Sequence, residues 1–173
     1  MNSTDQPVSM IDYLVPAWQR VLNRPVINAE DNFFDLGGDP RMAGELFRVI
    51  SGSVGRDLPP LTLLQAPTIQ ELAKVLEQPR PPRFPDVVLL KKGSGGPPIF
   101  MTHGLGGSVM EVLNLARSLP SSHVVYGLQA PGSDGREKPL RRVEDLADLY
   151  LPAMRDVQPH GPYLLIGYSL GGL

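Results

Sequence analysis

The stretch Tyr163-Leu164-Leu165-Ile166, followed directly by Gly167-Tyr168-Ser169-Leu170-Gly171-Gly172, decides how the second half of this chain folds. Four apolar residues in a row are typical of a buried strand, and Gly-x-Ser-x-Gly after such a strand is the pattern of a nucleophile elbow. In that sharp strand-to-helix turn, glycines let the backbone fold back closely enough to lift a serine hydroxyl above the sheet. The stretch therefore predicts an exposed and nucleophilic Ser169.

Upstream of the elbow, short apolar runs alternate with helical patterns. Strands are predicted at residues 87–90, 98–102 and 124–128, and helices at residues 109–119 and 143–157. Strands that alternate with helices favour crossover connections and a parallel sheet. The run over 98–102 leads into His103-Gly104-Leu105-Gly106-Gly107, whose backbone amides could approach an anion closely. We predict the opening half of an α/β-hydrolase fold over residues 87–173.

The first part of the chain has a helical pattern instead. Apolar residues recur at helical spacing over residues 11–22, where Pro16 predicts a kink or a restart of the helix. A second helix is predicted from Pro40, with Asp39 as its cap, and a third from the capping box of Thr68 and Glu71. Helices this short require mutual support, so we predict a small bundle.

These patterns divide the chain into a helical domain over residues 1–78 and an α/β domain over residues 87–173. Between them, residues 79–86 are rich in proline, which favours an extended linker. The predicted fold class is therefore a small helical, carrier-like bundle joined to a truncated α/β-hydrolase fold.

The composition excludes several classes of function. The 173 residues carry a formal net charge of -2, no cysteine and three scattered histidines, so we predict neither disulfides nor a metal site. The lack of a basic excess argues against binding to nucleic acid. No apolar run approaches the ~20 residues that span a membrane, and the amino terminus has no secretory pattern. We therefore expect a cytoplasmic protein without membrane contacts.

The segment Asp31-Asn32-Phe33-Phe34-Asp35-Leu36-Gly37-Gly38-Asp39-Pro40 resembles the acyl or peptidyl carrier domains of nonribosomal peptide and polyketide synthases. Their signature is D-N-F-F-D-L-G-G-x-S, and residues 61–69 are similar to the segment before the family's last helix. The resemblance implies a carrier domain whose signature serine bears phosphopantetheine. Because Pro40 occupies the serine position, we expect no phosphopantetheine on this chain. Selection for an unloaded carrier and decay of the gene are equally open explanations.

A second resemblance covers about residues 87–173. The segments 98–107, 126–132, 158–163 and 167–172 are similar to the thioesterase domains that end such assembly lines. In that family the serine takes an acyl chain from the carrier thiol, and water or an internal nucleophile then releases the product. The resemblance implies that Ser169 is the nucleophile. The Leu170 amide would be one oxyanion-hole donor, and Leu105 or Gly106 would supply the other.

Residues other than the serine complete a hydrolase triad. In hydrolases with this elbow the acid and the histidine follow the serine, and neither follows Ser169 here, so we expect the chain as given to be inactive. His103 lies on the oxyanion strand, and we predict that it orients the glycine-rich loop rather than acting as the base. An uncovered strand at Ser169 would also make the second half poorly soluble or partly molten.

Two hypotheses about function follow from these resemblances. In the first, the chain is the carrier and thioesterase portion of an assembly-line synthase, and its partners are upstream synthase modules or a partner carrier protein that presents an acyl or peptidyl thioester. In the second, the chain is a non-catalytic, carrier-like docking module with an unloaded phosphopantetheine site.

Overall fold

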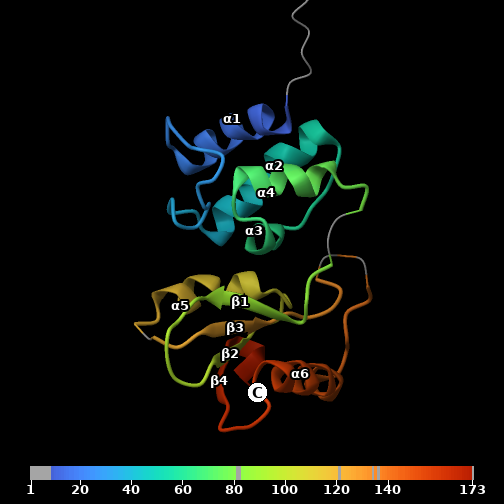
Figure 1. The fold of residues 1–173 in the computed structure, drawn as a ribbon. Helices are drawn as coiled ribbons and strands as arrows, with labels where there is room; N and C mark the ends of the chain where they lie inside the picture. Colours follow the sequence, from blue (N-terminus) through green and yellow to red (C-terminus); the bar gives the residue numbers. More distant parts are fainter. Residues whose placement is uncertain (1–8, 81–82, 121, 134, 136, 173) are drawn as a thin grey trace, which may run out of the picture. The chain divides into compact units, whose positions relative to one another are not determined.

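The computed structural model describes residues 9–80, 83–120, 122–133, 135 and 137–172 of the chain. Its contacts divide the chain into two compact units, Met1–Pro82 and Arg83–Leu173, each with its own hydrophobic core (Figure 1). The division falls inside the segment predicted as a linker, residues 79–86, of which residues 81 and 82 lie outside the described part.

The first unit is built from helices. They are α1 (Met10–Leu22), α2 (Pro40–Val54), α3 (Thr62–Gln65) and α4 (Ile69–Glu77). Asp39 caps α2 as predicted, because its side chain accepts a hydrogen bond from the Met42 amide at 2.7 Å. The predicted capping box of Thr68 and Glu71 is present at the start of α4.

Two details of this unit differ from the sequence-based expectation. Helix α1 runs continuously through Pro16, so it does not restart there. The proline removes only one backbone donor, while the buried stripe that includes Leu14, Trp18 and Val21 holds both halves of the helix against the core. The short α3 was not predicted, because four residues are too few to display a helical period.

Aromatic rings occupy the centre of the first unit. Trp18 is fully buried and meets Phe33 edge-on with ring centroids 5.1 Å apart, and Phe33 meets Phe34 in the same way at 5.4 Å. Gly38 lies so close to Phe33 that a Cβ atom there would be 2.6 Å from the Phe33 carbonyl oxygen. Residues 31–39 thus supply two of the three core rings, those of Phe33 and Phe34, and the cap of α2, and Pro40 follows them directly.

The second unit contains a sheet whose described strands are β1 (Val87–Lys91), β2 (Ile99–Thr102), β3 (Val125–Leu128) and β4 (Leu164–Gly167), in the order β1-β3-β2-β4. Strand β2 is parallel to both β3 and β4. Strand β1 is antiparallel to β3, so the prediction of a purely parallel sheet was wrong. The short connection over residues 92–98 reverses the chain, whereas a parallel arrangement needs a crossover of about a dozen residues.

Helical elements cover both faces of this sheet (Figure 1). Helix α6 (Val143–Val157) packs Tyr150 and Met154 against Phe100 and Leu128 on one face. On the other face lie η1 (Val109–Glu111) and α5 (Leu113–Ser118), and the Val109 side chain closely approaches Gly127. The single helix predicted over residues 109–119 is therefore split into two elements.

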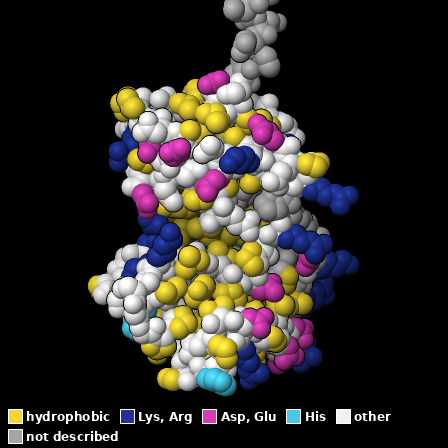
Figure 2. Space-filling view, in the orientation of Figure 1, with side chains coloured by type: hydrophobic (Ala, Val, Ile, Leu, Met, Phe, Trp, Pro, Cys, Tyr) yellow, Lys and Arg dark blue, Asp and Glu magenta, His cyan; other side chains and the backbone are white. Residues whose placement is uncertain are grey.

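Strand β4 is an edge strand of the described sheet. Leu165 on this strand is 64% exposed, and Tyr168 and Leu170 in the following turn are exposed as well. Figure 2 shows hydrophobic side chains among charged ones on the visible surface of the second unit. Among the described residues, no helix has the length and apolar character needed to cross a bilayer.

Candidate functional site

The pairing of β2 with β4 brings the two predicted site segments to one edge of the sheet. Thr102, the last residue of β2, pairs in parallel with Gly167, the last residue of β4. The Tyr168 amide donates a hydrogen bond to the Thr102 carbonyl oxygen at 3.3 Å, and the Thr102 hydroxyl donates to the Gly171 carbonyl oxygen at 2.7 Å. The glycine-rich segment and the serine turn therefore leave the carboxyl ends of adjacent strands, where α/β sheets bind ligands.

The turn at Ser169 has the strained backbone of a nucleophile elbow. Ser169 has a φ of 54°, in the left-handed region that residues other than glycine rarely adopt, and it begins η2 (Ser169–Gly172). A Cβ atom at Gly171 would lie 2.5 Å from the Thr102 hydroxyl oxygen, and one at Gly167 would collide with the backbone of the same turn. Both motif glycines are thus required by close approach of the backbone, and Ser169 is exposed to solvent.

Residues 104–107 form a tight turn after β2. The Gly107 amide donates to the Gly104 carbonyl oxygen at 3.3 Å, and this bond closes the turn. The Gly104 amide donates to Oε2 of Glu111 at 2.9 Å. Both ends of the turn are therefore hydrogen-bonded, and the side chain of Leu105 in its middle is 86% exposed.

The sequence predicted oxyanion-hole donors at Leu105 or Gly106 and at Leu170, and none of these three amides has an acceptor among the described residues. The Gly104 amide, in the same segment, is not available as a donor to a ligand because it is hydrogen-bonded to Glu111. Nothing in the sequence pattern singled out Glu111, because a lone carboxylate after a glycine-rich loop matches no motif.

His103 is buried and held by two hydrogen bonds. Its Nδ1 lies 2.7 Å from the Gly104 carbonyl oxygen, and its Nε2 lies 2.8 Å from the Tyr150 hydroxyl. Because a carbonyl oxygen can only accept, Nδ1 carries a proton and donates to Gly104, and Nε2 shares a hydrogen bond with the Tyr150 hydroxyl. Burial, and secondarily the charge of Asp86, raises the pKa of Tyr150, so this hydroxyl remains a donor. Among the described residues, no hydrogen bond joins His103 to Ser169.

We expect Tyr150→Phe to lower the stability of the second unit by about 1–3 kcal/mol, because it leaves the buried Nε2 of His103 without a partner. Hydrogen exchange of the β2 and β4 amides in the intact chain measures this change. Tyr126→Phe is the matched control, since the Tyr126 hydroxyl has no hydrogen-bond partner among the described residues. Equal exchange rates in the two variants would contradict a structural role for the Tyr150 hydroxyl.

A small apolar cavity of about 170 Å³ adjoins the elbow. Cavities of roughly 150 Å³ lined by apolar side chains accommodate a benzene-sized molecule. The elbow therefore has room beside it for one small apolar group. The cavity is lined from β2 and its turn, from α6 and from η2 by Thr102, His103, Gly104, Val143, Leu146, Ala147, Tyr150, Leu170 and Gly171.

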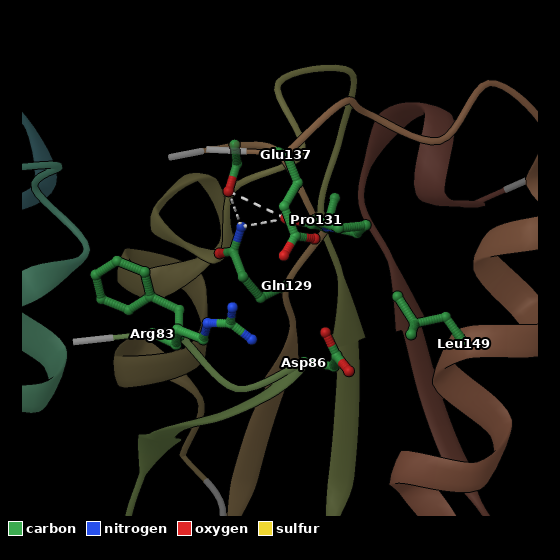
Figure 3. Close-up of a pocket in the computed structure, with 10 residues that line it drawn as sticks. Arg83, Asp86, Gln129, Pro131, Glu137 and Leu149 are labelled. Carbon is green, nitrogen blue, oxygen red and sulfur yellow. Dashed lines mark hydrogen bonds between the residues drawn. The ribbon is translucent and has the colours of Figure 1, made fainter. Parts of the chain in front are cut away.

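A larger hollow, of about 430 Å³, lies between the residues before β1 and those after β3 (Figure 3). The side chains of Arg83, Asp86 and Glu137 point toward it, and it shares no residue with the cavity beside the elbow. Burial and then the negative charge of Glu137 raise the pKa of Asp86. The folded chain consequently takes up a proton at Asp86 more readily than the unfolded chain, and this group stabilises the fold less as the pH rises through its folded pKa.

Gln129 connects this hollow to the glycine-rich turn. Its side chain is almost fully buried, its Nε2 donates to the Gly107 carbonyl oxygen at 2.8 Å, and its Oε1 accepts from the Val109 amide at 3.0 Å. Its side-chain amide also donates to the Ser133 hydroxyl. The start of η1 is thereby fixed to the end of β3.

In the first unit, the position predicted for phosphopantetheine attachment holds Pro40, the first residue of α2. Proline has no hydroxyl that could form the phosphodiester bond. The serines of the same helix, Ser51 and Ser53, are near its other end, and Ser51 lies about 16 Å from Pro40 along the axis at 1.5 Å per residue. The residues present at the start of α2 therefore do not fit this attachment.

Two family models match the chain. The model described as a phosphopantetheine attachment site matches residues 12–76, and the model described as a thioesterase domain matches residues 97–173. Both resemblances proposed from the sequence are thereby confirmed. Members of the first family normally carry phosphopantetheine, which makes Pro40 a departure from the family pattern.

Similar proteins are much longer than this chain. It is 37% identical over 162 residues to a dimodular nonribosomal peptide synthase of Bacillus subtilis, an alignment that covers 93% of this chain and 7% of that protein. It is 35% identical over 166 residues to indigoidine synthase of Dickeya dadantii, which covers 95% of this chain and 11% of that protein.

One solved structure is similar to almost the whole of this chain. A four-domain nonribosomal peptide synthetase in its holo form, bound to AMP and glycine, matches 99% of this chain and 13% of its own, with 26% identity and a TM-score of 0.55. The chain thus spans about a tenth of the length of each of these three proteins. It combines a carrier domain of the phosphopantetheine-attachment family with thioesterase-domain sequence, and it is a relative of the nonribosomal peptide synthetases.

Proposed function

We propose that the second unit carries an acyl-transfer site in which Ser169 is the nucleophile. The Ser169 hydroxyl oxygen bonds to the carbonyl carbon of an acyl or peptidyl thioester, the carbon–sulfur bond breaks, and the hydroxyl proton ends on the departing thiol. Water or a nucleophile within the acyl chain then displaces the serine oxygen, which regains a proton. The product is released as an acid or as a ring.

The main support is the placement of Ser169 relative to the free amides. The residue follows β4 with a φ of 54°, and β4 pairs in register with β2, whose turn leaves the Leu105 and Gly106 amides without acceptors among the described residues. Together with the Leu170 amide they are suited to stabilise the negative oxygen of a tetrahedral intermediate. Loss of one such donor typically slows a reaction by about 100- to 1,000-fold.

The carrier unit has a different part in this proposal. Because Pro40 offers no hydroxyl, the carrier is not loaded, and the thioester reaches Ser169 from upstream synthase modules or from a separate carrier protein. Its acyl or peptidyl chain is the substrate, and the expected location is the cytoplasm.

One observation favours a second candidate function. The carrier fold is intact around Pro40, with Asp39 capping α2 and Phe33 buried beneath Gly38, although the attachment residue is missing. A carrier domain that is folded but lacks its attachment residue is suited to act as a docking module, which binds synthase domains and carries no acyl chain. Capture of such domains by the unaltered chain, without modification of Ser169, would favour this candidate.

A fluorophosphonate probe tests the nucleophile. We expect slow modification of the chain, because among the described residues no histidine is hydrogen-bonded to Ser169 and an unassisted serine is a weak nucleophile. Mass spectrometry should place the added group on Ser169, and Ser169→Ala should abolish it. Ser51→Ala, in the other unit, is the control and should react like the unaltered chain. Modification that persists in Ser169→Ala, or no modification at all, would contradict the proposal.

A further inference from the structure

The carboxylate of Glu111 lies against the glycine-rich turn. Glu111 is the last residue of η1, and its Oε2 accepts a hydrogen bond from the Gly104 amide at 2.9 Å. Hydrogen bonds from an amide to an ionised carboxylate are roughly twice as strong as those between neutral groups. The first amide of the turn is therefore held firmly by a side chain seven residues further along.

The fit between the turn and this carboxylate extends to both of its oxygens. A Cβ atom at Gly104 would lie 2.7 Å from Oε2, and a Cβ atom at Gly106 would be closer still to Oε1. Each carboxylate oxygen thus faces one glycine, and no side chain larger than hydrogen could stand at either position while Glu111 stays in place. These two glycines make room for Glu111, in addition to their role in the turn.

The elbow segment also packs against Gly104. The aromatic ring of Tyr168, the residue before Ser169, would lie 3.1 and 3.3 Å from the same Cβ position, measured to its Cδ1 and Cε1 atoms. Glu111 and Tyr168 therefore both pack closely around Gly104. A change in the position of Glu111 would alter the turn and its contact with the elbow together.

We propose that Glu111 is a positioning residue for the oxyanion-hole turn. By taking up the Gly104 amide, it fixes the turn in the form that leaves the Leu105 and Gly106 amides to the substrate oxygen. The catalytic role of Glu111 rests on the proposed function of Ser169. The contact between Glu111 and the turn can be measured without any reaction at Ser169.

Selective isotope labelling isolates the amides concerned. The sequence contains His-Gly pairs only at 103–104 and 160–161, and Leu-Gly pairs only at 36–37, 105–106 and 170–171. Labelling histidine and leucine with ¹³C at the carbonyl and glycine with ¹⁵N restricts a carbonyl-correlated spectrum of the whole chain to Gly37, Gly104, Gly106, Gly161 and Gly171. The set contains the turn, the elbow and two distant controls.

The first expected result concerns protonation of the carboxylate. On acidification the Gly104 amide proton should shift as Glu111 gains a proton, because the amide then loses a charged acceptor. This shift should be absent in Glu111→Gln and unchanged in Glu144→Gln, whose carboxylate pairs with Arg142 at the surface. The same acid shift in Glu111→Gln and in the unaltered chain would overturn the proposal.

The second expected result separates positioning from charge. In Glu111→Ala, Gly104 should exchange its amide proton about tenfold to a hundredfold faster, because it loses a hydrogen bond to a charged group. Gly106 and Gly171 should change their shifts, while Gly37 and Gly161 should not. Glu111→Gln keeps an oxygen acceptor and should restore the positions of Gly106 and Gly171. If Glu111→Ala leaves both unchanged, Glu111 does not position the turn, whatever the fluorophosphonate probe reports for Ser169.

Discussion

Pro40→Ser should convert a chain that accepts no phosphopantetheine into one that is fully modified. With coenzyme A and a promiscuous phosphopantetheinyl transferase, the intact mass of the variant should rise by one phosphopantetheinyl group, and that of the unaltered chain should not change. We expect this because the structure around the attachment position is intact. Asp39 caps α2, Gly38 packs closely against Phe33, and only the hydroxyl at position 40 is missing. A serine in the first turn costs little, about 0.4–1 kcal/mol from the lost rigidity of proline.

Pro40→Ala provides the control for this experiment. It removes the proline ring as the serine variant does, but it supplies no hydroxyl, so it should stay unmodified. Modification of Pro40→Ala or of the unaltered chain would show that another residue is the attachment point. Failure of a folded Pro40→Ser variant to react would show that more than the hydroxyl has been lost from the recognition surface.

Gly38→Ala should strongly destabilise the first unit. The added Cβ atom would lie 2.6 Å from the Phe33 carbonyl oxygen and would also meet the Phe33 ring, which is fully buried and cannot move without disturbing Trp18. Overpacking of this kind typically costs about 1–3 kcal/mol and occasionally more. Since small domains have a free energy of unfolding of about 5–15 kcal/mol, we expect a large drop in the denaturation midpoint.

The fluorescence of Trp18, the one tryptophan of the 173 residues, reports this unfolding for the first unit. Gly52→Ala is the matched control, because a Cβ atom at Gly52 in α2 has open space around it. Alanine in a helix interior should raise the free energy of unfolding by about 0.5–1 kcal/mol. Opposite signs are therefore expected for the same chemical change, and equal midpoints for the two variants would show that Gly38 is not packed against Phe33.

Much of the helical unit could be predicted because its signals are local. Asp39 and Pro40 mark the start of α2, and Thr68 with Glu71 marks that of α4, since a cap depends only on residues within one turn. The aromatic pair Phe33-Phe34 of the carrier signature is buried in the core. Helix α3 was missed because its four residues carry no cap hydrogen bond and show no period.

The direction of β1 in the sheet could not be predicted from local sequence signals. Each of the four strands lies where an apolar run predicted it, but the direction of β1 depends on the length of its connection to β2. Alternation of strands and helices further along the chain does not apply to this first pair. A connection too short to contain a helix was the signal that could have identified the antiparallel strand.

In the candidate site too, the sequence predicted some features and not others. Motif spacing identified Ser169 and the glycine-rich turn, because the elbow imposes its glycines on the sequence. The contacts of Glu111 with Gly104 and of Tyr150 with His103 join residues that are 7 and 47 positions apart and belong to no motif. Such contacts arise only when the helices dock on the sheet, and a single sequence holds no record of them.

The strand ladder pairs Thr102 with Gly167, and the Thr102 hydroxyl adds a side-chain hydrogen bond to the Gly171 carbonyl oxygen. The distance from the serine turn to the glycine-rich turn is thus set by the ladder together with this one contact of Thr102. Residues of β2 and β4 other than Thr102 and Gly167 can be exchanged for others of similar bulk while the geometry between the two turns persists. The other side chains of these two strands can therefore vary in evolution with little effect on the separation of the two turns.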